Sequence, residues 1–241
     1  MIHAVRWTAR KLSQRLALVE NLVYRRQAPL APLRFRPLPD PLTPPPVEAE
    51  LDDSAWPAIQ PHTHWGSRNL NFILRGRFTV PDGWRAGGPA ALYLPLGVAG
   101  DFSHPEALAY VDGRPLAACD RHHQEIILPE ALADGREHTL ALHGWTGLIQ
   151  VPYGDPGLYM GECAVVQVDQ PTRDFLATAR VALGIAQHLE ANSPVKGALL
   201  NALDAAFLAL DLREPFGDAF YASVPVAHAC LREGLAQAGA A

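Results

Sequence analysis

The sequence has little cysteine, little charge and no long apolar run. Its three cysteines, Cys119, Cys163 and Cys230, lie far apart in 241 residues. So small and odd a set argues against a disulfide framework and against a cysteine-rich zinc site, and it suits a reducing compartment. We therefore expect a cytoplasmic protein. No window of about 18 apolar residues occurs, so we expect no membrane partner.

Several kinds of functional site are also missing. The net charge is −5, whereas nucleic-acid-binding proteins are more often basic, so no nucleic-acid partner is expected. There is no phosphate-binding loop and no dinucleotide fingerprint. Gly144–Gly147 places Trp and Thr between glycines, where a nucleophile elbow needs a serine or similar group. The carboxylates are scattered, so we predict no catalytic residues, no metal ligands and no cofactor within this chain.

What the sequence does contain begins with a basic segment. Residues 1–36 hold eight Lys and Arg residues and one acid, whereas the remainder holds twelve basic and 24 acidic residues. Apolar residues recur at helical spacing, which predicts a basic amphipathic helix over residues 1–28: Val5, Leu12, Leu16, Val19 and Val23. Such a helix is marginal alone, so it should dock on an acidic surface, either its own chain's or a neighbouring subunit's. We expect a homo-oligomer assembled through it.

A proline-rich stretch follows the basic segment. Residues 29–61 hold ten of the 22 prolines, including Pro44–Pro46. Because proline fixes φ and lacks an N–H donor, residues 29–62 are predicted to form an extended connector, neither helix nor central strand. A strap across the protein surface is favoured over a proline-rich ligand for a recognition domain.

Two further patterns complete the fold prediction. Residues 63–170 show period-two alternation and turn residues, including an Asp112-Gly113 hairpin turn, and predict an antiparallel β-sandwich. Residues 171–241 show helical periodicity and predict three helices, with Thr172 and Ser193 as N-caps and a third helix from about Ser223. The fold class is therefore α+β.

Several phrases of the sequence occur in a distinctive order. They are Arg77–Pro81 followed by Trp84, then 106–116 with Tyr-Val-Asp-Gly-Arg-Pro-Leu, then 120–129, which begins Asp-Arg-His-His-Gln-Glu. Their order and spacing resemble the N-terminal, non-catalytic region of the glycoside hydrolase family 38 α-mannosidases, in the cytosolic and vacuolar branch. The resemblance extends over residues 1–46 and over the helical phrases 206–213, 220–223 and 231–235, and so covers nearly the whole chain.

The resemblance implies that the sandwich of residues 63–170 is jelly-roll-like and galactose-binding-like. It also implies a parent enzyme that hydrolyses terminal non-reducing α-D-mannose residues and holds zinc in its catalytic domain. In that family a His-x-His-x-Asp zinc phrase follows the helical segment, whereas this chain ends at Ala241, and His62-Thr63-His64 lacks the acid. We therefore expect an accessory region that is not itself catalytic, docks on its own catalytic domain, shapes the cleft rim and supports assembly. The alternatives are an autonomous carbohydrate-binding module, which would bind a mannose-containing glycan, and an oligomerisation scaffold.

Two sets of residues are candidates for binding. Trp145 lies just before the loop Gly147–Pro156 and Tyr153 lies within it. Both could present aromatic faces to a sugar ring, although aromatics at sandwich ends are more often core residues. The polar set Asp120, Arg121, His122 and Glu125 predicts either an interdomain contact or a solvated loop. His122 and His123 are adjacent and would face opposite sides of a strand, so they cannot jointly hold a metal.

Overall fold

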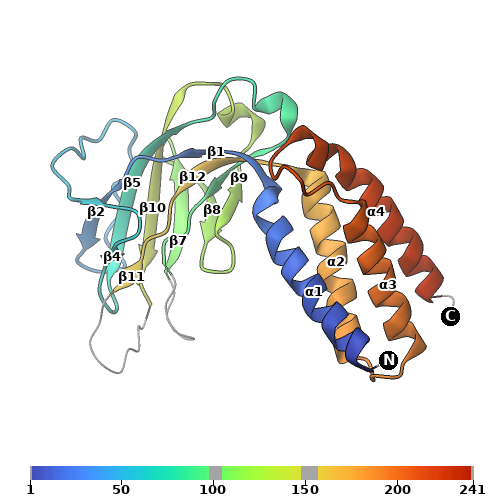
Figure 1. The fold of residues 1–241 in the computed structure, drawn as a ribbon. Helices are drawn as coiled ribbons and strands as arrows, with labels where there is room; N and C mark the ends of the chain where they lie inside the picture. The colour runs from blue at the N-terminus through green and yellow to red at the C-terminus, as the bar shows by residue number, and fades with distance from the viewer. Residues whose placement is uncertain (1, 98–104, 148–156, 240–241) are drawn as a thin grey trace. The chain divides into compact units, whose positions relative to one another are not determined.

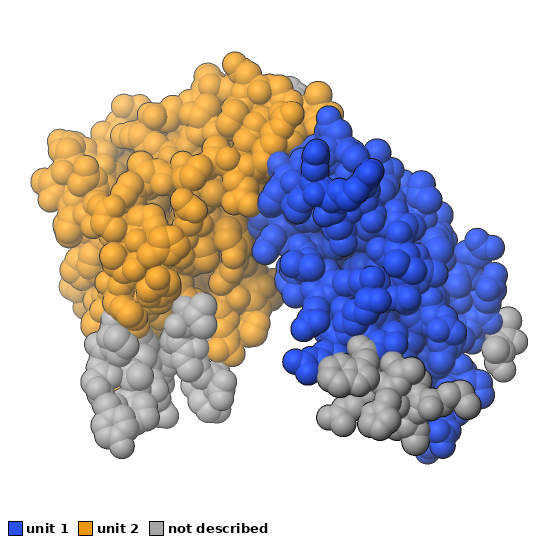
Figure 2. All heavy atoms as spheres, in the orientation of Figure 1, with its two compact units in different colours: residues 1–25, 168–241 blue, residues 26–167 orange. Residues whose placement is uncertain are grey.

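A computed structural model describes residues 2–97, 105–147 and 157–239. The chain forms two compact units, one made of residues 1–25 and 168–241 and the other of residues 26–167 (Figure 2). The described residues comprise an N-terminal helix, antiparallel sheets and three C-terminal helices, which confirms the predicted α+β class. The predicted boundaries differ from these units, because the N-terminal helix packs with the C-terminal helices.

The first unit is a helical bundle. Its helices are α1 (Ile2–Glu20), α2 (Gln170–His188), α3 (Pro194–Ala209) and α4 (Asp218–Gly239), which lie side by side in Figure 1. The stripe of α1 contributes Leu12, Leu16 and Val19 to the same buried cluster as Phe175 and Phe207. Leu12, Leu16 and Val19 of the stripe predicted from the sequence are therefore buried within this chain's own bundle.

Charge pairing accompanies this packing. Arg15 Nη1 lies 2.8 Å from Asp204 Oδ1 of α3, and Lys11 Nζ lies 3.7 Å from the same oxygen. Glu20 pairs with Arg180 of α2. The sequence left open whether the basic helix docks on its own chain or on a neighbouring subunit. In the structure its basic residues pair with an acidic residue of its own chain.

The starts of helices α2, α3 and α4 can be compared with the starts predicted from the sequence. Ser193 Oγ accepts a hydrogen bond from the backbone N–H of Lys196, which confirms the predicted cap of α3. The prediction for α2 was wrong, because Asp169 is the cap and its carboxylate accepts from both the N–H and the hydroxyl of Thr172. Helix α4 begins at Asp218, ahead of the predicted start, and contains Pro225.

The second unit is a β-sandwich of two main sheets. One sheet has the order β3-β2-β5-β10-β7-β8 and the other β1-β12-β6-β9. Their bounds are β1 Tyr24–Pro29, β2 Leu33–Leu38, β3 Ala58–Ile59, β5 Asn71–Thr79, β6 Ala90–Tyr93, β7 Glu106–Val111, β8 Arg114–Cys119, β9 Glu125–Ile127, β10 Glu137–Trp145 and β12 Ala164–Val168. A small sheet pairs β4 (His64–Trp65) with β11 (Leu158–Tyr159). Short 3-10 turns are η1 (Asn21–Val23), η2 (Arg85–Gly87) and η3 (Glu130–Leu132).

Alternation along the central strands builds the sandwich core. Leu74 of β5 and Leu142 of β10 are directly opposite each other in the register and both are fully buried. They share one cluster with Leu92 of β6 and Val165 of β12, which belong to the other sheet. The alternate residues of β5 and β10 point to the opposite face of the six-stranded sheet, away from this core. That outer face carries the candidate site.

The Asp112-Gly113 hairpin prediction is confirmed. It joins β7 to β8, and both residues have positive φ, +49° and +77°. This is the backbone geometry of a two-residue turn that matches the twist of the strands.

The proline-rich segment contains a strand that the sequence did not predict. Strand β2 pairs along its length with β5, so residues 33–38 are part of the larger sheet. The N–H of Phe35 donates to Pro57 O on the side away from β5. Pro37 has the same strand parity, so its missing N–H faces the edge beyond the two-residue β3. Proline is tolerated there because no ladder hydrogen bond is lost.

Candidate functional site: a groove beside the proline-rich strap

Residues 39–57, here called the strap, cross the outer face of the six-stranded sheet between β2 and β3. Val47 and Trp56 of the strap pack on a small buried cluster that includes Ile73 and Ala141 of the sheet. The proline-rich segment is therefore extended, and its apolar side chains cover part of one face of the sheet.

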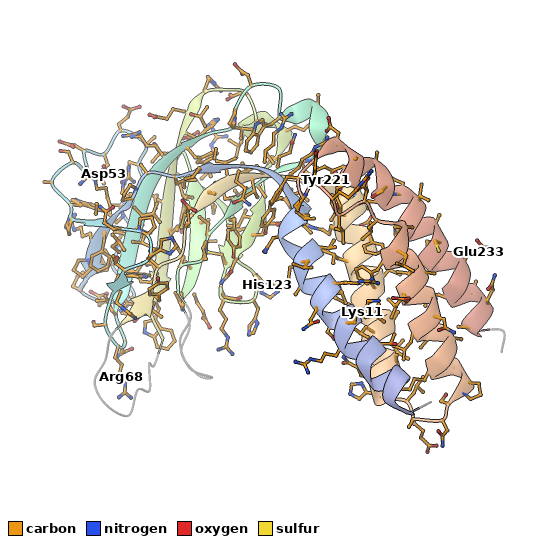
Figure 3. All side chains as sticks on the ribbon, viewed as in Figure 1. Lys11, Asp53, Arg68, His123, Tyr221 and Glu233 are labelled. Carbon is orange, nitrogen blue, oxygen red and sulfur yellow. The ribbon has the colours of Figure 1, made fainter. Side chains whose placement is uncertain are left out.

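A single arginine holds the middle of the strap. Arg75 of β5 is fully buried. Its Nε donates to Asp53 Oδ2 at 2.8 Å, its Nη1 to Pro46 O and its Nη2 to Glu48 O, both at 2.9 Å. Asp53 compensates the buried charge, and the two carbonyls occupy further N–H groups of the guanidinium. Figure 3 labels Asp53 in this segment.

The end of the strap is fastened by two arginines of β2. Arg34 Nη1 donates to Trp56 O at 2.9 Å. The guanidinium of Arg36 lies 5.4 Å from the centroid of the Trp56 ring, which is a cation–π distance. The roles of Arg34, Arg36 and Arg75 were not predicted from the sequence. Arg75 lies between Leu74 and Gly76 in a largely apolar strand, and a charged residue in such a position indicates a buried partner.

The strap covers only part of the outer face and leaves a groove of about 370 Å³ beside it. Its floor is made of two rows of cross-strand neighbours. One row is Asn71, Trp145 and Glu106; the next is His143, Leu108 and Ala118. Pro41 of the strap and Asp120 after β8 complete the lining.

Trp145 is held in place by its indole nitrogen. Its Nε1–H donates to Asn69 Oδ1 at 2.8 Å, and the backbone N–H of Asn69 donates to Gly147 O. Asn69 has a φ of +54°, a left-handed conformation that asparagine adopts more readily than most residues. Tyr153, the predicted partner of Trp145, lies outside the described residues.

Asp120 is the acceptor of a tight turn. Its Oδ1 accepts from the backbone N–H of His122 at 2.6 Å and of His123 at 2.8 Å, and the ring Nδ1 of His123 lies 3.1 Å away. Partial burial raises its pKa, but the bonds from the His123 ring and the two N–H groups outweigh burial and hold the pKa at about 2. Figure 3 labels His123 in this turn between β8 and β9.

The structure separates the members of the predicted polar set. Asp120 lines the groove with Trp145. Arg121 Nε donates to His122 Nε2 at 3.0 Å, so these two side chains contact each other. Glu125 begins β9 in the other sheet, opposite Tyr93. Among the candidates that the structure describes, Trp145 and Asp120 line the same groove.

The other polar groups near this face have identifiable surroundings. Partial burial lowers the pKa of His143, so its ring is neutral at pH 7. His138 lies between two carboxylates, with Nδ1 2.7 Å from Asp112 Oδ2 and Nε2 3.1 Å from Asp134 Oδ1. These contacts tie the β7–β8 turn and residue 134 to strand β10, so both carboxylates are engaged in holding the fold.

Neither a metal centre nor a membrane-spanning helix is found among the residues that the structure describes. Within residues 2–97, 105–147 and 157–239, no group of three or more His, Cys, Asp or Glu side chains is placed to hold a metal ion. In the same part of the chain, no helix combines the length and apolarity that crossing a bilayer requires.

Comparison with known proteins finds no matching family model and no matching curated protein. Among solved structures, a calcium-binding mutant of Bacteroides uniformis β-glucuronidase 2 overlaps 58% of this chain, at 17% identity and a TM-score of 0.40. A Ruminococcus gnavus β-glucuronidase overlaps 60% at 14% identity and a TM-score of 0.32. This chain covers 18% and 30% of those two chains. These neighbours are glycoside hydrolases, and overlaps with such TM-scores carry no argument about function.

Proposed function

We propose that this chain is an accessory, non-catalytic region of an α-mannosidase that hydrolyses terminal non-reducing α-D-mannose residues. The support is the ordered set of phrases that resemble the family 38 enzymes. The observation that carries it is where these phrases lie: 106–116 forms the β7–β8 hairpin, 120–129 contains the Asp120 turn and β9, and 220–223 lies in the first turns of α4.

Residues within these phrases specify the fold. Asp112 adopts the positive φ of the hairpin turn. Tyr221 donates its hydroxyl to Leu22 O at 3.1 Å, and the guanidinium of Arg25 lies 4.5 Å from its ring centroid. A chain that keeps these residues in this order keeps the hairpin and the bundle, which is what an accessory region needs.

The proposed role has three parts: docking on the catalytic domain, shaping the rim of its cleft and supporting assembly, all in the cytoplasm. In this proposal zinc and the reacting carboxylates belong to the catalytic domain, while Asp53, Asp112 and Asp120 of this chain hold its own fold through hydrogen bonds. A homo-oligomer through α1 would use the face opposite its buried stripe, where Leu18 is 66% exposed.

Association with a catalytic polypeptide tests the docking proposal. The chain is mixed with a purified family 38 catalytic polypeptide, and sedimentation velocity measures whether the two travel together. We expect a complex whose affinity falls in Arg121→Ala, a member of the predicted interdomain set. Arg136→Ala, which removes another surface arginine whose partner is Asp134, is the matched control and should leave the affinity unchanged. Independent sedimentation of the two polypeptides at tens of micromolar would contradict the proposal.

A further inference from the structure

We propose that the groove beside the strap binds a neutral, hydroxyl-rich ring of the pyranose class, with Trp145 as the apolar wall and Glu106 and Asp120 as hydroxyl acceptors. The proposal rests on the geometry of unit 26–167 alone and does not depend on the mannosidase assignment. It assigns a ligand class to a surface that would otherwise be the uncovered part of a sheet.

One wall of the groove is a hydrogen-bonded turn and its floor is β-strand. Its volume of about 370 Å³ falls within the range typical of small-molecule sites. The wall at Pro41 belongs to a turn fixed by Asp40, which accepts from the N–H of Leu42 at 2.8 Å and from the hydroxyl of Thr43 at 2.9 Å. The floor is strand, and strands position side chains more precisely than loops do.

The polar groups of the groove favour hydroxyl donors. The carboxylates of Glu106 and Asp120 accept hydrogen bonds, and the amide of Asn71 and the neutral ring of His143 can each both donate and accept. A sugar hydroxyl can donate a hydrogen bond to either carboxylate. With Asn71 or His143 it can act as donor or as acceptor. An anionic ring would meet two carboxylates of like charge, so uronic acids should be excluded.

The apolar part of the groove fits the other face of such a ring. Leu108 is 36% exposed on the floor, next to Ala118 in the register. Trp145 is half-buried, and its N–H is already bonded to Asn69, so its remaining contribution to the groove is apolar surface. A pyranose presents C–H groups on one face and hydroxyls at its edge, and this lining matches both.

Titration of the purified chain tests the site. Methyl α-D-mannopyranoside and methyl β-D-glucopyranoside are titrated to tens of millimolar, followed by tryptophan fluorescence and calorimetry. Sodium glucuronate is the charged counterpart at the same ionic strength. We expect saturable binding of at least one neutral pyranoside in the millimolar range and weaker binding of glucuronate.

Variants assign the signal to the groove. Trp145→Ala should lower the affinity about tenfold, and Trp145→Phe, which keeps an aromatic face, should lower it less. Tyr159→Ala removes an exposed aromatic of the same unit outside the groove lining and should leave the affinity unchanged. The absence of saturable binding, an unchanged affinity in a folded Trp145→Ala, or equal binding of glucuronate would each overturn the proposal. Failure here leaves sedimentation with the catalytic polypeptide unaffected, so the two proposals are tested separately.

Discussion

Arg75 Nε and Asp53 Oδ2 are 2.8 Å apart, and this contact joins the centre of strand β5 to the middle of the proline-rich strap. The arginine side chain is fully buried and the aspartate side chain is 19% exposed. A buried cation of this kind is compensated only as long as its partner stays in place. The strap, the outer sheet face and one wall of the groove therefore depend on the same ion pair.

Replacing Arg75 with Met should release the strap. The apolar side chain cannot satisfy Asp53 or the carbonyls of Pro46 and Glu48, so these groups must regain water by moving outward. We expect a loss of about 3 kcal/mol in the free energy of unfolding, and faster hydrogen exchange over residues 46–53. Urea denaturation and hydrogen-exchange mass spectrometry measure the two effects.

The control for that variant lies on the same face of the same strand. Arg77→Met makes the identical substitution at a side chain that is 48% exposed and 3.8 Å from Glu137. It should change the unfolding free energy by less than about 1 kcal/mol. Equal effects of the two substitutions, or unchanged exchange over the strap in Arg75→Met, would contradict the assigned role of Arg75.

The local parts of the fold could be predicted from the sequence because they rest on short-range signals. Period-two alternation identified β5, Asp112-Gly113 identified a hairpin, and Ser193 identified a helix start. Strand β2 could not be predicted, because a proline such as Pro37 counts against a strand unless it is known which edge its missing N–H faces. That information exists only once β5 is paired on the other side.

The candidate site was predictable only in part. The sequence placed Trp145 in an aromatic pair with Tyr153, and Asp120 in a separate polar set with Arg121, His122 and Glu125. The meeting of Trp145 and Asp120 in one groove depends on the register of β10 against β7 and on the position of β8. The spacing of residues along the sequence does not show which residues pair across strands. Glu106 and His143 were therefore not recognised as members of the site.

The N-terminal helix should contribute directly to the stability of the helical unit. Leu12 is fully buried in the cluster shared by all four described α-helices, whereas Leu18 on the same helix is 66% exposed. Leu12→Ala should cost about 2–5 kcal/mol through lost burial and a cavity, and Leu18→Ala should cost under about 1 kcal/mol. Thermal and urea unfolding followed by circular dichroism compare the two. Equal destabilisation would show that α1 does not pack as described.

Thiol reactivity should distinguish the three cysteines. Burial raises the pKa of Cys119 and of Cys163 to about 12, with a smaller contribution from the Asp120 carboxylate for Cys119 and from the neighbouring Cys119 for Cys163. Cys230 is only half-buried on α4. At pH 8 the native protein should therefore react with Ellman's reagent at one thiol, and the Cys230→Ser variant at none. Three equally fast thiols in the native state would contradict the packing of the sandwich core.

The Asp120 turn should make stability depend on acid pH. Its pKa is about 2, below the ordinary value of 3.8, so the carboxylate contributes stability that is fully present above about pH 4. That contribution is lost as the pH falls through about 2. Asp120→Asn should therefore be less stable than the natural protein at pH 7, and the gap should close between about pH 4 and pH 2. Urea denaturation over this range measures it, and a gap that is the same at every pH would contradict the turn's assigned role.

On the proposed function, this chain supports an α-mannosidase without carrying out the reaction itself. The most direct measurement is the hydrolysis of p-nitrophenyl α-D-mannopyranoside with added zinc, by the purified chain alone and by the chain together with a family 38 catalytic polypeptide. We predict no turnover by the chain alone, and higher or more heat-resistant turnover by the pair than by the catalytic polypeptide alone. Chelator-sensitive turnover by the chain alone, or identical activity with and without it, would contradict the claim.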